Sequence, residues 1–202
     1  TGPVSRWQQR VQDWAGDPGG KGLLNLTILT DAHAVAGDPG LLESVRDTLF
    51  SRCSDDQLLM AHFARPVLQF ATPLNLFGSL KKPQHGIDIK KGALFPLVHG
   101  VRAMALQCRI RETSTLARLD KLVAAGAMEP GFAEDLGEAM ELFSELRLSR
   151  QLAKLQGEDE TVEDNHIVVQ QLSSLERDVL RDALHLVSEF KQRLSRRFHL
   201  EY

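Results

Sequence analysis

The chain has 202 residues, of which 43% are hydrophobic and 25% charged, and it can bury the core of one substantial domain. Its net charge of −3 is too small to favour a nucleic-acid or membrane partner. No apolar run reaches the roughly 18 residues of a transmembrane helix. We therefore expect a cytoplasmic globular protein that binds neither nucleic acid nor membrane. Its first residue is Thr1 and not methionine, so we expect a piece of a longer protein.

The first 40 residues carry one helical and one strand-like pattern. Trp7, Val11 and Trp14 have the i, i+4, i+7 spacing of one helix face. Residues 23–29 form a short apolar run, which we interpret as a buried strand that ends at Asp31.

A helical period dominates from residue 41 onward. Apolar spacing, capping residues and glycine stops predict further helices over residues 41–53, 55–67, 93–108, 113–126, 132–155 and 173–194. Residues 71–92 hold several prolines and glycines, which is typical of a functional or mobile loop. The predicted fold class is all-α, a multi-helix bundle of about six to seven helices whose short N-terminal segment is compatible with one β-strand.

Three arginines interrupt apolar helical faces, where an unpaired charge is costly. Arg102 lies inside the most apolar helix, Arg118 at the edge of the next apolar stripe, and Arg147 along the stripe of the long helix. Guanidinium groups bind carboxylates and phosphates and keep their charge when partly buried. We therefore predict that the three arginines converge on one anion-binding pocket.

The polar loop before the most apolar helix is predicted to form the rim of this pocket. Its candidate residues are His85, Asp88 and Lys90. A second interpretation is structural: Arg102 pairs with Asp88, and Arg147 pairs with Glu145 or another nearby acid. The sequence leaves both interpretations open. Because the histidines lack metal-ligand spacing and no Cys/His cluster exists, these patterns favour no metal site.

Several motifs together resemble one known family. They lie at residues 87–92 (IDIKKG), 102–106 (RAMAL), 113–119 (TSTLARL), 146–148 (LRL) and 164–167 (DNHI). The family is the nucleotidyltransferase substrate-binding domain at the C-terminus of bacterial signalling proteins, which often carry upstream CBS and cyclic-nucleotide-binding domains. The resemblance covers residues 23–202.

The resemblance implies a division of the chain and a reaction class. Residues 1–37 would be the end of a nucleotidyltransferase domain, and residues 38–202 would form the helical substrate-binding domain. The full-length parent would use Mg²⁺ and a nucleoside triphosphate, in the manner of uridylyl- and adenylyltransferases. Its acceptor would be a nitrogen-regulatory-type protein or a small molecule. We expect no cofactor and no catalysis from this chain alone, because the Gly-Ser loop with its paired carboxylates is absent from the sequence.

Asp31 acquires a candidate role only through this resemblance. At this place the family typically has an acidic residue followed two positions later by arginine, whereas this chain has Asp31 and His33. By resemblance Asp31 would be a third catalytic carboxylate that, with the missing domain, binds Mg²⁺ or deprotonates the acceptor hydroxyl. The alternative is an aspartate that caps the end of a strand or turns the chain.

Two functions remain as hypotheses. In the first, the chain is the substrate-binding domain of a uridylyl- or adenylyltransferase-like enzyme in bacterial signal transduction. Arg102, Arg118, Arg147 and Lys90 would then bind a phosphate or an acidic acceptor. In the second, the chain is a non-enzymatic regulatory or dimerisation module coupled to upstream CBS or cyclic-nucleotide-binding domains. Its homodimer would form through the helix at residues 93–108.

Overall fold

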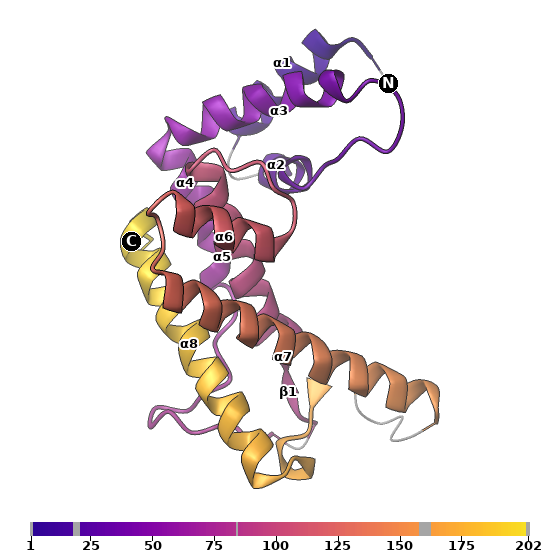
Figure 1. The fold of residues 1–202 in the computed structure, drawn as a ribbon, viewed down its shortest axis with the longest axis vertical. Helices are drawn as coiled ribbons and strands as arrows, with labels where there is room; N and C mark the ends of the chain where they lie inside the picture. Colours follow the sequence, from indigo (N-terminus) through magenta and orange to yellow (C-terminus); the bar gives the residue numbers. More distant parts are fainter. Residues whose placement is uncertain (1, 18–20, 84, 158–162, 201–202) are drawn as a thin grey trace. The chain divides into compact units, whose positions relative to one another are not determined.

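The computed structural model of the protein describes residues 2–17, 21–83, 85–157 and 163–200. These residues hold eight α-helices (Figure 1). The helices are α1 Val4–Gly16, α2 Gly22–Thr30, α3 Pro39–Ser54, α4 Gln57–Ala64, α5 Phe95–Gln107, α6 Thr115–Ala124, α7 Pro130–Leu155 and α8 Ser174–Phe198. Helices of all types account for 70% of the described residues and strands for only 3%, so the predicted all-α fold class is confirmed.

Shorter elements lie between these helices. They are the 3-10 helices η1 Arg65–Leu68 and η3 Val169–Gln171, the π-helix η2 Lys90–Leu94, and the strands β1 Ile87–Asp88 and β2 His166–Ile167. Among the described residues, no helix combines the length and the apolar character needed to cross a membrane.

The predicted N-terminal strand is wrong, because residues 22–30 form α2. The hydroxyls of Thr27 and Thr30 donate back to the carbonyls of Leu23 and Leu26, each at 2.8 Å, within the helix. A short apolar run does not distinguish a strand from a buried helix, since both bury it. This extra helix brings the number above the predicted six to seven. Asp31 therefore follows a helix and not a strand.

The first compact unit contains Thr1–Pro66, Gly100–Glu129 and Leu194–Tyr202. In this unit α1 and α2 both pack against α3, and α4 contacts α2 and α3 (Figure 1). Val11, Leu26 and Leu49 are fully buried on these helices. The unit therefore brings together residues from well-separated parts of the sequence.

The second compact unit contains Val67–His99 and Pro130–Arg193. Its strands β1 and β2 pair antiparallel, and α7 contacts both β2 and η2. A capping box holds the start of α8, within the range 173–194 where the sequence predicts a helix. The backbone N–H of Ser173 donates to Glu176 Oε2 at 2.7 Å, and the backbone N–H of Glu176 donates to Ser173 Oγ at 3.2 Å.

Candidate functional site

Asp31 immediately follows α2 and joins three helices of the first unit. Its backbone N–H donates to the carbonyl of Ile28 at 3.2 Å, which ends the helix. Its side chain is 35% exposed and accepts hydrogen bonds from α5 and α6. The carboxylate is thus held at the end of a helix yet is still open to solvent.

Two arginines hold the carboxylate of Asp31, one on each oxygen. Arg102 on α5 donates to Oδ2 through Nε at 3.0 Å and through Nη2 at 2.6 Å. Arg118 on α6 donates to Oδ1 through Nη2 at 2.7 Å. Hydrogen bonds between charged partners are among the stronger ones in proteins. The orientation of Asp31 is therefore fixed from both sides.

Arg118 is 1% exposed, which is unusual for an arginine. Its Nε donates to the carbonyl of Glu112 at 2.7 Å, and its Nη2 also lies 3.4 Å from the carbonyl of Thr30. These carbonyls and the Asp31 carboxylate supply the partners that a buried guanidinium needs. Arg118 therefore supports both Asp31 and the backbone around it.

Arg46 on α3 joins the same group of residues and was not predicted from the sequence. It is 5% exposed, and its Nη2 donates to the carbonyl of Arg111 at 2.6 Å, while Nη1 pairs with Glu43 at 3.0 Å. The Nε of Arg46 is buried without a hydrogen-bond partner among the described residues. The sequence pattern that indicates Arg102 also indicates Arg46. Arg46 lies four residues after Leu42 on an apolar helix face, just as Arg102 lies four residues after Val98.

These charged residues form two ion-paired groups that meet at the carbonyl of Thr30, which accepts from Arg46 at 3.5 Å and from Arg118 at 3.4 Å. We call the two groups together the Asp31 cluster. Arg111 pairs with Glu43 at 2.6 Å and with Asp47, and so links the exposed edge of the network to Arg46. The cluster consists of Arg46, Arg102, Arg111 and Arg118 together with Asp31, Glu43 and Asp47. Guanidinium groups outnumber carboxylates in this set, so the cluster has positive charge in excess.

The pKa values of the central pair follow from these contacts. Partial burial alone would raise the pKa of Asp31, but the hydrogen bonds and charge of Arg102, and then those of Arg118, outweigh burial and lower it. Burial lowers the pKa of Arg118, and the carboxylate of Asp31 opposes this shift. A guanidinium remains protonated at neutral pH. The pair is therefore ionised under physiological conditions.

The other predicted residues lie in the second unit. Arg147 on α7 donates through Nε to Asn165 Oδ1 at 2.7 Å, and the carbonyl of Asn165 accepts from the N–H of Ile89 at 3.0 Å. Asp88 accepts from the backbone N–H of Lys91 at 2.9 Å and pairs with its ammonium group at 3.3 Å. Arg147 therefore supports the short β1–β2 sheet.

The structure thus sorts the predicted residues into two groups. Arg102 and Arg118 meet on Asp31, whereas Arg147 belongs to the second unit with Asn165. Arg102 has Asp31 as its partner, where the structural interpretation predicts Asp88. Arg147 donates to the amide oxygen of Asn165, where that interpretation predicts Glu145 or another nearby acid. The remaining rim candidates, His85 and Lys90, are exposed on either side of β1. The functional roles of all these residues stay predictions.

Replacing Arg147 with methionine is expected to lower the free energy of unfolding by about 1–2 kcal/mol, because Asn165 loses a charged donor beside the sheet. Urea unfolding followed by circular dichroism measures this change. Lys154→Met is the matched control on α7, since the Lys154–Asp164 pair is largely exposed, and it should leave the free energy of unfolding unchanged within error. Equal effects of the two substitutions would contradict the supporting role of Arg147.

The described residues offer no ready-made metal site around Asp31. No group of three or more His, Cys, Asp or Glu side chains in the described ranges is arranged to hold a metal ion. The Mg²⁺ that the resemblance implies would therefore need ligands besides Asp31. We derive no chemical step through such an ion.

Comparison with protein-family models matches residues 57–198 to one family, described as "Putative nucleotidyltransferase substrate binding domain". The matched range contains Arg102, Arg118 and Arg147, whereas Asp31 precedes it. Comparison with curated proteins and with solved structures gives no match.

Proposed function

The chain belongs to the family of putative nucleotidyltransferase substrate binding domains, and we propose that the Asp31 cluster is where it recognises a phosphate-bearing substrate. One observation carries the proposal: a partly exposed carboxylate holds two guanidinium groups inside a cluster that has positive charge in excess. A triphosphate offers many acceptor oxygens and the negative charge that the cluster lacks. Arginine is the residue best suited to such a ligand.

Within the cluster, Arg102 and Arg118 have different parts in this recognition. The side chain of Arg102 is 13% exposed and that of Arg118 only 1%. Arg102 is therefore the group that contacts a phosphate oxygen, and Arg118 is a positioning residue behind it. Because Arg118 is also held by the carbonyl of Glu112, it loses little conformational entropy when a ligand displaces Asp31. The phosphate would compete with Asp31 for the same donors.

The ionisation of Asp31 disfavours one of the roles that the family resemblance implies for it. A carboxylate whose pKa is lowered is a weaker proton acceptor at neutral pH, so it is a poor general base for a hydroxyl. It remains a charged oxygen ligand. Because both of its oxygens accept from guanidinium groups, we propose that Asp31 serves as their counter-ion, and that the ligands of any Mg²⁺ in the full-length parent come from elsewhere in that protein.

The wider setting of the protein is a proposal that rests on the family resemblance. We propose that the parent is a uridylyl- or adenylyltransferase-like enzyme of bacterial signal transduction, located in the cytoplasm and regulated through upstream CBS or cyclic-nucleotide-binding domains. Mg²⁺ and a nucleoside triphosphate would be its cofactor and donor. Its acceptor would be a nitrogen-regulatory-type protein or a small molecule.

Calorimetric titration of the chain with ATP, and separately with UTP, tests the recognition step. We expect binding that Arg102→Gln weakens by about tenfold, which corresponds to about 1.4 kcal/mol. Arg109→Gln is the control, because Arg109 pairs with Asp55 on the exposed surface of the same unit, outside the cluster. Thermal unfolding confirms that each variant is folded. No binding by the chain and none by the full-length protein would contradict the proposal.

A further inference from the structure

A turn in the second unit displays two large apolar side chains to solvent. Leu76 is 101% exposed and Phe77 is 92% exposed, the highest values among the exposed large hydrophobic residues of the described chain. Adjacent, fully exposed leucine and phenylalanine side chains are unfavourable in water unless something covers them. The turn is therefore a candidate contact surface.

The backbone of this turn is held by its own hydrogen bonds. The N–H of Asn75 donates to the carbonyl of Ser79 at 2.8 Å, and the N–H of Gly78 donates to the carbonyl of Asn75 at 3.0 Å. The side-chain oxygen of Asn75 accepts from the N–H groups of Phe77 and Ser79, each at 2.9 Å. Leu76 and Phe77, which we call the apolar tip, thus project from a hydrogen-bonded turn. The side chain of Asn75 accepts hydrogen bonds there in place of a backbone carbonyl.

The turn is also fixed to α8. A ring nitrogen of His185, Nε2, lies 2.8 Å from the carbonyl oxygen of Gly78. Gly78 has a positive φ of 75°, which favours glycine, and a Cβ atom there would lie 2.7 Å from the His185 ring and displace it. The N–H of Lys81 donates to the carbonyl of Pro73 at 3.1 Å and closes the base of the turn.

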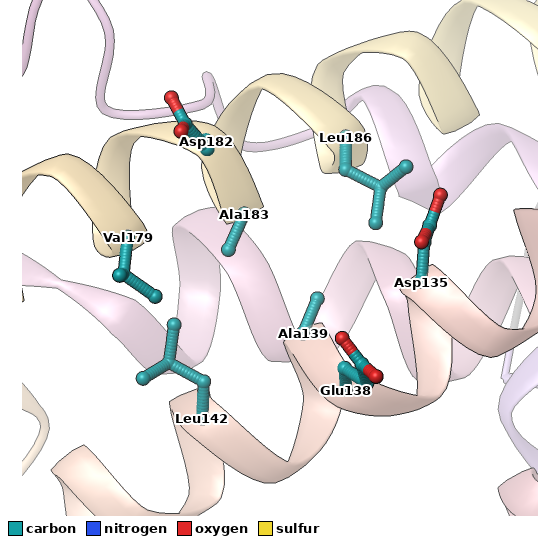
Figure 2. Close-up of a pocket in the computed structure, with 8 residues that line it drawn as sticks. All are labelled: Asp135, Glu138, Ala139, Leu142, Val179, Asp182, Ala183 and Leu186. Atoms are coloured by element: carbon teal, nitrogen blue, oxygen red, sulfur yellow. The ribbon is translucent and has the colours of Figure 1, made fainter.

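A groove of about 380 Å³ runs between α7 and α8 in the same unit. Figure 2 shows Leu142 and Val179 pointing toward one another across it, with Ala139 and Ala183 facing each other between the helices. The small alanines leave room for an incoming side chain, and Val179 is 45% exposed. The groove is therefore apolar on its floor and open to solvent.

The charges around the groove and the turn are opposite. Carboxylates of Asp135, Glu138 and Asp182 line the groove, and none of its eight lining residues is Lys or Arg. Lys81 and Lys82, both exposed, are the last two residues of the turn. Beside the groove, Asp182 also pairs with the Nε of Arg181 at 3.3 Å, and Asp135 and Glu138 add two further carboxylates. Carboxylates therefore outnumber guanidinium groups there, and an apolar tip with two ammonium groups matches an apolar groove of net negative charge.

We propose that the turn at residues 73–82 docks into the α7–α8 groove of a second copy of this chain. The turn is attached to α8 at His185, which lies one residue before Leu186 and three after Asp182, both in the groove lining. Turn and groove consequently border the same stretch of one helix. A two-fold axis beside α8 places each turn on the groove of the partner and makes the contact reciprocal. This face differs from the helix at residues 93–108, whose Leu97, Val101 and Leu106 are buried.

Sedimentation velocity over a range of protein concentrations tests this dimer. We expect a concentration-dependent monomer–dimer equilibrium whose dissociation constant rises by about tenfold in Phe77→Ser and in Asp182→Lys. Both side chains are exposed, so the fold should be retained, which thermal unfolding checks. Leu155→Ser is the matched control, because Leu155 is 84% exposed on α7 but does not line the groove.

A charge exchange sharpens the test. Lys81→Glu with Lys82→Glu should weaken the dimer, and Asp135→Lys with Asp182→Lys should weaken it as well. Combining all four substitutions should restore it, because the turn and the groove then attract again. A chain that is monomeric at every concentration, or a dimer insensitive to both Phe77→Ser and Asp182→Lys, would overturn the proposal.

Two further results would assign these surfaces to other occupants and would equally overturn the proposal. The first is a monomer that sediments with anionic phospholipid vesicles in a Phe77-dependent manner. The second is a monomer that binds a basic amphipathic helical peptide in an Asp182-dependent manner. Neither result bears on nucleotide binding by the Asp31 cluster, which lies in the first unit.

Discussion

Replacing Asp31 with asparagine is expected to lower the free energy of unfolding by about 2–4 kcal/mol. The substitution removes the counter-ion of Arg118. Because the side chain of Arg118 is 1% exposed, water cannot solvate its charge in place of the carboxylate. Breaking a fully buried ion pair typically costs about 3–5 kcal/mol. We expect a somewhat smaller loss here, because the side chain of Asp31 is 35% exposed. Urea unfolding followed by circular dichroism measures the change.

The matched control for this substitution is Asp55→Asn. Asp55 also pairs with an arginine of the first unit, Arg109, but both side chains are more than half exposed. Its replacement should change stability by less than about 0.5 kcal/mol. Comparable losses in the two variants would show that burial of Arg118 contributes nothing to the effect.

The stability difference between the wild type and Asp31→Asn should depend on pH in a defined direction. The pKa of Asp31 is lower in the folded than in the unfolded protein, so its contribution is fully present above the unfolded value of about 3.9. The contribution is lost as the pH falls through the lower folded pKa. The two proteins should therefore differ most near neutrality and converge in acid. A constant difference across this range would contradict the assignment.

Replacing Arg118 with methionine should destabilise the protein by about 3–4 kcal/mol, the second large effect that we predict. Methionine fills much of the space of the arginine stem, but it leaves the carbonyl of Glu112 without its 2.7 Å donor and removes one of the two arginines on Asp31. Unfolding in urea again gives the value. Arg111→Met is the control in the same cluster, because Arg111 is 44% exposed, and it should cost less than about 1 kcal/mol.

A double-mutant cycle separates the Asp31–Arg118 pair from the surrounding contacts. The loss in the combined Asp31→Asn, Arg118→Met variant should be smaller than the sum of the single losses by about 1–3 kcal/mol, because each single change already breaks the same interaction. Strict additivity would show that the two residues stabilise the fold independently.

The sequence showed which arginines are unusual but not what they contact. An arginine on an apolar helical face is recognisable from spacing alone, which is why Arg102 and Arg118 were predicted and why Arg46 could have been. Their shared partner lies 71 residues from Arg102 and 87 from Arg118. No local pattern encodes so distant a contact. For this reason the structural interpretation of the sequence pairs Arg102 with the nearer Asp88.

The secondary structure was predictable where a segment is long and was not where it is short. The long helix α7 and the start of α8 follow from many apolar repeats and a capping box. In α2 only nine residues are available, and Leu24 and Ile28 remain more than 60% exposed on its outer side, so no apolar stripe indicates a helix. Helix propensity and apolar periodicity predict a helix reliably only when they are summed over a long segment.

Calorimetric titration of Asp31→Asn with ATP, under conditions where the variant is folded, tests the central claim most directly. If the guanidinium groups of the Asp31 cluster recognise phosphate, removing the carboxylate that competes for them should tighten ATP binding by about tenfold relative to the wild type, even as it lowers stability. Unchanged or weaker ATP binding by the folded variant would contradict the proposed recognition of phosphate by this cluster.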